Sequence, residues 1–106
     1  MSDELPETDI QQLPISLRRG ATRAGWTSLM PVQAKAIPYL LAGREMMIQA
    51  RTGSGKTGAF VLPMLERIDP ELFSCQALVL VPTRELAKQV WEVSEIICQQ
   101  TGIRTV

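Results

Sequence analysis

The run of residues 50–57 has the composition of a loop that binds phosphate groups: Ala50, Arg51, Thr52, Gly53, Ser54, Gly55, Lys56 and Thr57. Its spacing matches the pattern G-x-x-x-x-G-K-[ST], with alanine where the first glycine usually stands. The two glycines let the backbone curl so that successive N–H groups face an anion, and a following helix adds its positive end. Lys56 can place an ammonium at the β- and γ-phosphates, and the Thr57 hydroxyl can ligate Mg²⁺. The pattern predicts a bound nucleoside triphosphate with Mg²⁺, and a glycine-rich turn with an exposed lysine is the alternative.

Two further segments carry polar groups suited to a nucleotide or a nucleic acid. Residues 25–33 end in Gln33, whose carboxamide can pair with the edge of adenine in a bidentate way. Residues 82–87 follow an apolar run, and there Thr83, Arg84 and the start of a helix can hold phosphate oxygens. Taken singly, each has a simpler interpretation, because Gln33 can be an ordinary surface residue of a helix and Thr83 an ordinary helix cap.

Apolar residues at helical spacing indicate the elements that position these groups. Residues 13–24 form one amphipathic stretch that Gly25 ends. A second helix is expected to begin near Met30, and Pro38, which lacks an N–H group, is expected to restart it as a separate short helix. Helices are also predicted from Lys56 and from Thr83, the latter ending at Gly102.

Three short apolar runs are predicted to be strands. Residues 45–49 precede the phosphate-binding loop, residues 77–81 are five apolar residues without alternation, and residues 103–106 resemble the start of a third strand. A continuous apolar run is typical of a strand covered on both faces. The resulting order of strands and helices predicts an α/β fold, with a parallel sheet that has helices on both faces and is truncated after about three strands.

The composition excludes several other classes of site. The chain has 106 residues, no histidine and two cysteines, so neither histidine-based acid–base chemistry nor a recognisable zinc site is expected.

Residues 18–56 contain seven basic residues against one acidic residue, a net charge of +6 that can attract phosphate. Residues 1–12 form a polar lead-in with four acids and no base, the opposite of a signal peptide or a mitochondrial presequence, and a cytoplasmic location is the simplest interpretation.

Three segments, in this order, resemble the DEAD-box ATP-dependent RNA helicases: Gly-Trp…Pro-x-Gln at 25–33, ARTGSGKTGAFVLP from Ala50, and VPTRELAKQ from Val81. The resemblance implies that residues 13–106 are the N-terminal part of a first RecA-like, ATP-binding domain of the P-loop NTPase class. It identifies residues 25–33 as the Q motif, 50–57 as motif I and 82–87 as motif Ia. Gln33 would then select adenine, motif I would hold ATP and Mg²⁺, and Pro82, Thr83 and Arg84 would hold the RNA backbone.

The sequence departs from the family pattern at the Q motif. Leu29 stands where the family usually has a first proline, Trp26 replaces the usual phenylalanine, and the upstream aromatic that stacks on adenine falls near Thr8. We therefore expect weaker selectivity for adenine than is typical of the family.

The resemblance also implies which parts lie beyond these residues: the DEAD segment, and a second RecA-like domain that would be a partner of this one. The 106 residues alone are therefore expected to be catalytically inactive. Two other functions remain open at this point: a non-catalytic nucleotide- or RNA-binding module, and a superfamily-2 translocase that acts on DNA.

Overall fold

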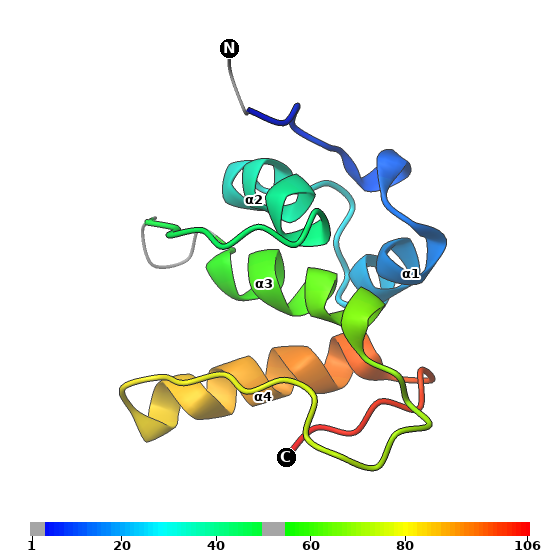
Figure 1. Cartoon of the computed structure of the whole chain (residues 1–106), viewed down its shortest axis with the longest axis vertical. Helices are drawn as coiled ribbons and strands as arrows, with labels where there is room; N and C mark the ends of the chain where they lie inside the picture. The colour runs from blue at the N-terminus through cyan, green and yellow to red at the C-terminus, as the bar shows by residue number, and fades with distance from the viewer. Residues whose placement is uncertain (1–3, 50–54) are drawn as a thin grey trace.

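The structure of the chain is a computed structural model that describes residues 4–49 and 55–106. Figure 1 shows an arrangement of helices joined by long connecting segments. In chain order, the elements of the described residues are η1 (Ile10–Gln12), α1 (Ile15–Arg23), α2 (Pro31–Leu41), α3 (Lys56–Met64), η2 (Leu65–Arg67) and α4 (Arg84–Cys98).

Helix α1 confirms the amphipathic stretch predicted over residues 13–24. Leu17 and Ala21 are fully buried on one of its faces, and Leu13 is buried just before it. Gly25 follows the helix at a positive φ of 81°, a conformation that glycine adopts without steric cost. The chain can therefore turn sharply from α1 toward the segment that carries Gln33.

Helix α2 corrects the expectation that Pro38 restarts a separate helix, because Pro31–Leu41 is one continuous helix with Pro38 inside it. A proline in a helix leaves the carbonyl four residues earlier without its usual donor. Here that carbonyl belongs to Ala34, and it accepts a hydrogen bond from the Thr8 N–H at 3.1 Å. The N-terminal segment thus provides the missing donor and satisfies the carbonyl that the proline leaves free.

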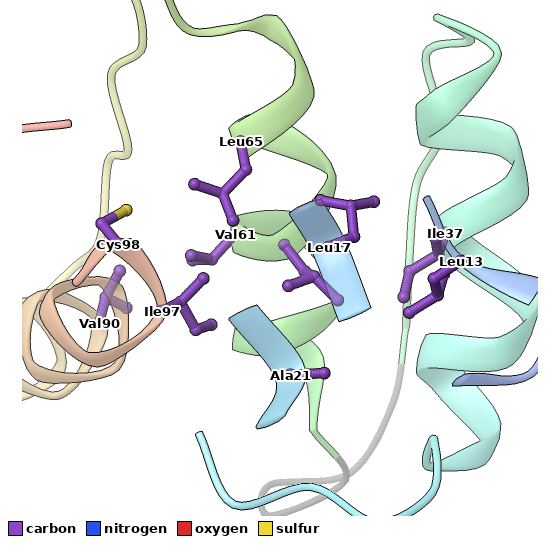
Figure 2. Packing of buried hydrophobic residues seen from close by; sticks show 10 residues of the cluster. Leu13, Leu17, Ala21, Ile37, Val61, Leu65, Val90, Ile97 and Cys98 are labelled. Carbon is purple, nitrogen blue, oxygen red and sulfur yellow. The ribbon is translucent and has the colours of Figure 1, made fainter. Parts of the chain in front are cut away.

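Helix α3 lies at the centre of the fold and contacts α1, α2 and α4 (Figure 1). Figure 2 shows side chains from these helices converging on it. The buried cluster consists of Leu13, Leu17, Ala21, Ile37, Val61, Leu62, Leu65, Val90, Ile97 and Cys98. Residues from all four α-helices share one cluster, which holds α3 in place through its second half.

Helix α4 begins as the sequence predicts but ends earlier. The Thr83 hydroxyl accepts a hydrogen bond from the Leu86 N–H at 3.1 Å and so caps the helix. The last helical residue is Cys98, whereas Gly102 was the expected end. Across residues 4–49 and 55–106, no helix combines the length and apolar character needed to cross a bilayer.

The expected parallel sheet is absent from the part of the chain that the structure describes. Residues 45–49 and 77–81 lie in connecting segments, residues 103–106 lie in the segment after α4, and no backbone hydrogen bond found among the described residues joins one of these runs to another. Large apolar side chains there are exposed, such as Met47 at 96% and Leu80 at 84%. A strand is held by hydrogen bonds to a neighbouring strand, so an apolar run without such a neighbour stays outside a sheet.

Candidate nucleotide site

Motif I is described from Gly55 onward, and the predicted residues Ala50, Arg51, Thr52, Gly53 and Ser54 lie outside the described residues. Gly55 caps the N-terminus of α3 at a φ of 90°, and Lys56 and Thr57 are the first two residues of the helix. A Cβ atom at position 55 would lie 2.7 Å from Met30 Sδ, closer than real Cβ atoms approach. The positive φ therefore favours glycine at this position, and a side chain there would also displace the Met30 thioether.

The N-terminus of α3 is suited to an anion. The first N–H groups of a helix have no partner within the helix, and Gly55 has no side chain to cap them. The helix dipole adds partial positive charge at this end, and Lys56 adds a full one. The Thr57 hydroxyl is an oxygen donor of the kind that Mg²⁺ accepts. Groups of these types are the ones that a phosphate with its magnesium ion requires.

Gln33 is not the surface residue of the simpler interpretation, because its side chain is only 2% exposed. Its Oε1 accepts a hydrogen bond from the Met30 N–H at 2.9 Å, and its Nε2 donates to the Gly55 carbonyl oxygen at 3.3 Å. The same carbonyl accepts the Ala59 N–H of the first turn of α3. Gln33 thus ties the start of α2 to the start of α3.

Sequence reasoning did not predict this tie. A glutamine at the third position of a helix can bond back to the N–H group of the capping residue, and that part was available from spacing alone. The bond to Gly55 spans 22 residues of the chain and depends on how α2 packs against α3.

The rest of the Q motif packs against the same helix. Trp26 and Leu29 are partly buried against the core cluster. Gly58, in the first turn of α3, is buried, and a Cβ atom there would lie 2.6 Å from Trp26 Cζ2. Thr8, near which the resemblance places an aromatic that stacks on adenine, bonds through its backbone to Ala34, next to Gln33. The structure therefore brings Trp26, Gln33 and the start of motif I together.

The residues predicted to hold RNA lie at the start of α4. Pro82, Thr83 and Arg84 are all exposed, and the Thr83 hydroxyl serves as the helix cap. Helices α3 and α4 begin on the same side of the molecule, the left side in Figure 1. Two helix N-termini that can bind phosphate groups therefore lie on one side of the fold.

The family model of the DEAD/DEAH box helicases matches residues 30–106 of this chain. Among curated proteins, the chain is 53% identical over 78 residues to the ATP-dependent RNA helicase DbpA of Escherichia coli, covering 74% of this chain and 17% of that protein. It is 43% identical over 90 residues to the ATP-dependent RNA helicase DHH1 of Phaeosphaeria nodorum, covering 85% of this chain and 17% of that protein. The chain thus spans about a sixth of the length of these relatives.

A solved structure matches the whole chain. It is the RNA helicase Prp28 of Chaetomium thermophilum bound to ADP, with a TM-score of 0.83 and 34% sequence identity, covering all of this chain and 27% of that one. The arrangement of the helices is therefore that of a RecA-like helicase domain, even though the described residues form no sheet.

Proposed function

Because this chain belongs to the DEAD/DEAH box helicase family, we propose that it is the ATP-binding part of an ATP-dependent RNA helicase that remodels or unwinds RNA duplexes. One observation carries the proposal: the uncapped N-terminus of α3 presents Lys56 and Thr57 directly after a glycine at positive φ, and a buried glutamine holds that turn. Relatives whose names describe ATP-dependent RNA helicases support it.

The proposed roles within the nucleotide site follow from the types of side chain present. Lys56 compensates the charge of the β- and γ-phosphates, and Thr57 provides an oxygen ligand for Mg²⁺. The remaining residues of motif I, 50–55, supply main-chain N–H groups for the phosphates. Gln33 is proposed to select adenine. Bound ATP with Mg²⁺ supplies the chemistry of phosphoryl transfer, which these residues serve by binding and orientation.

The proposed RNA contact is with the backbone and not with the bases. Pro82, Thr83 and Arg84 offer a helix N-terminus and a guanidinium, both of which suit phosphate oxygens. Such contacts position a strand and carry no sequence information. We therefore expect low sequence specificity from this segment.

In the full-length protein, we propose that residues 45–49 and 77–81 pair as strands of a parallel RecA-like sheet, and that a second RecA-like domain is a partner. The exposed apolar side chains of Met47, Leu78 and Leu80 support this, because pairing and covering these segments would bury them. A cavity of about 590 Å³ along residues 68–79 and α4 is where further elements would pack.

The test of the proposal is Lys56→Ala in the full-length protein. RNA-stimulated ATP hydrolysis should fall to background, because phosphoryl-transfer catalysis depends on positioning and charge compensation. Lys88→Ala is a matched control, since Lys88 is exposed in the second turn of α4, and this variant should hydrolyse ATP at close to the normal rate. Retained turnover in Lys56→Ala refutes the assignment of the loop. Stimulation by single-stranded DNA but not by RNA refutes the choice of substrate.

A further inference from the structure

Trp26 lies against Gly58, so that the Q motif contacts the first turn of α3. A Cβ atom built on Gly58 would lie 2.6 Å from Trp26 Cζ2 and closer still to the adjacent Cη2. Heavy atoms essentially never approach a real Cβ atom within 3.0 Å. Both of these indole atoms belong to the outer ring, which extends beyond the reach of a phenylalanine side chain. Position 58 must therefore be glycine for as long as tryptophan occupies position 26.

The indole has little freedom to move away from this contact. The backbone N–H of Trp26 donates a hydrogen bond to the Ala21 carbonyl oxygen at 3.0 Å, which fixes the Trp26 backbone to the end of α1. Its side chain is partly buried against the core cluster. On the other side of Gly58, the same Cβ atom would lie 2.8 Å from Gln33 Nε2, which is itself bonded to Gly55. Gly58 is thus enclosed by two constrained side chains of one segment.

The turn that these side chains enclose is the one that carries the phosphate ligands. Gly58 directly follows Thr57, and it is the third residue of α3. Its N–H group belongs to the set at the start of the helix that has no partner within the helix. A displacement of this turn would therefore move the Lys56 side chain and the free N–H groups together.

We propose that Trp26 is a positioning residue for the nucleotide site: its indole fixes the first turn of α3, and Gly58 is the small partner that this packing requires. The proposal rests on the proposed function, nucleotide binding by motif I. Trp26 acts through the helix and need not touch the nucleotide. The two positions form a size-matched pair, in which a larger residue at 58 is tolerated only if the residue at 26 becomes smaller.

The test compares four forms of the full-length protein: the natural sequence, Gly58→Ala, Trp26→Phe and the double variant. Their Kd for a fluorescent ATP analogue is measured by anisotropy at a temperature where all four are folded. Gly58→Ala should raise the Kd by roughly tenfold, as expected when a methyl group is forced into a packed contact. The double variant should bind within about twofold of Trp26→Phe, because the phenylalanine leaves room for the methyl group.

Trp91→Phe combined with Gly58→Ala is the matched control, because Trp91 is 43% exposed on α4. This substitution should leave the weak binding of Gly58→Ala unchanged. A double variant of positions 26 and 58 that binds no more tightly than Gly58→Ala overturns the proposal. So does recovery of the urea midpoint without recovery of the Kd, since that pattern indicates stabilisation without positioning.

A second measurement decides the question even if Gly58→Ala fails to fold. Binding of ATP should change the tryptophan emission of the protein, and the change should persist in Trp91→Phe and become clearly smaller in Trp26→Phe. The opposite pattern, or no change in either variant, overturns the proposal. A natural-sequence protein that does not bind the analogue at all contradicts the proposed function. Binding without coupling between positions 26 and 58 contradicts only this inference.

Discussion

Replacing Gln33 with leucine tests whether this residue supports the fold before any nucleotide binds. The substitution removes two hydrogen bonds, one from the Met30 N–H at 2.9 Å and one to the Gly55 carbonyl at 3.3 Å. A typical intramolecular hydrogen bond contributes about 0.5–1.5 kcal/mol net, so the two together amount to about 1–3 kcal/mol. The Gly55 carbonyl keeps its bond from Ala59, which argues for the middle of that range.

We therefore expect Gln33→Leu to lower the free energy of unfolding by about 2 kcal/mol. Urea unfolding of the nucleotide-free protein, followed by circular dichroism, measures this as a lower midpoint with an unchanged slope. Gln11→Leu is the matched control, because Gln11 is exposed and such a substitution normally changes stability by less than about 0.5 kcal/mol. Equal midpoints for Gln33→Leu and Gln11→Leu would refute the reasoning, since they would show that the buried carboxamide contributes nothing to the fold.

Three further predictions concern motif Ia, the cysteines and the choice of base. Thr83→Ala should lower the free energy of unfolding in urea by about 1 kcal/mol, because it removes the hydroxyl that caps α4. Thr83→Ser keeps a hydroxyl and should unfold like the natural sequence. Equal stability of all three proteins would show that the cap does not stabilise the fold. Burial raises the pKa of the Cys98 thiol, despite the opposing charge of Arg23, so a thiol reagent at pH 8 should label exposed Cys75 first and Cys98 only on unfolding. Equal labelling rates of Cys75 and Cys98 in the folded protein contradict this prediction. The Kd for GTP should exceed that for ATP by less than about thirtyfold, and a thousandfold ratio contradicts weak selectivity.

The raised pKa of Cys98 determines how the stability of the fold changes with pH. The folded state holds the thiol proton more tightly than the unfolded state does, because burial raises the pKa of Cys98. This contribution to stability is fully present below the ordinary pKa of a thiol and is lost as the pH rises through the raised value. Cys98 is buried and belongs to the core cluster, whereas the Cys75 side chain is exposed.

The helices could be predicted where their determinants are local. The burial of Leu17 and Ala21 follows from their spacing, and Thr83 caps α4 because a threonine before a helical pattern can bond to the N–H group three residues later. Pro38 shows where local rules fail. Its effect on α2 depends on Thr8, 30 positions earlier in the chain, whose N–H bonds to the carbonyl that the proline leaves free.

The strands could not be established from their own residues. The apolar run at 77–81 predicts burial, yet burial of a strand needs a neighbour on each side, and the described residues provide none. For the candidate site, sequence patterns located Gln33, Lys56 and Thr57, but they did not predict what Gln33 contacts. Its bond to Gly55 is a property of the packing of α2 on α3.

This bond has a consequence for adenine recognition. A bidentate pair between a carboxamide and adenine contributes about 1–3 kcal/mol of discrimination. Oε1 and Nε2 of Gln33 each keep one further hydrogen-bonding position, but the carboxamide must also turn toward the base; each existing bond to Met30 or Gly55 that this rotation breaks costs about 1 kcal/mol. If one of these two bonds is lost, the preference for adenine over another base is at most about 2 kcal/mol, or roughly thirtyfold. If both are lost, almost no preference remains. Because Thr8 offers no aromatic ring to stack on the base, we expect the phosphates and not the adenine to provide most of the binding energy at the proposed site.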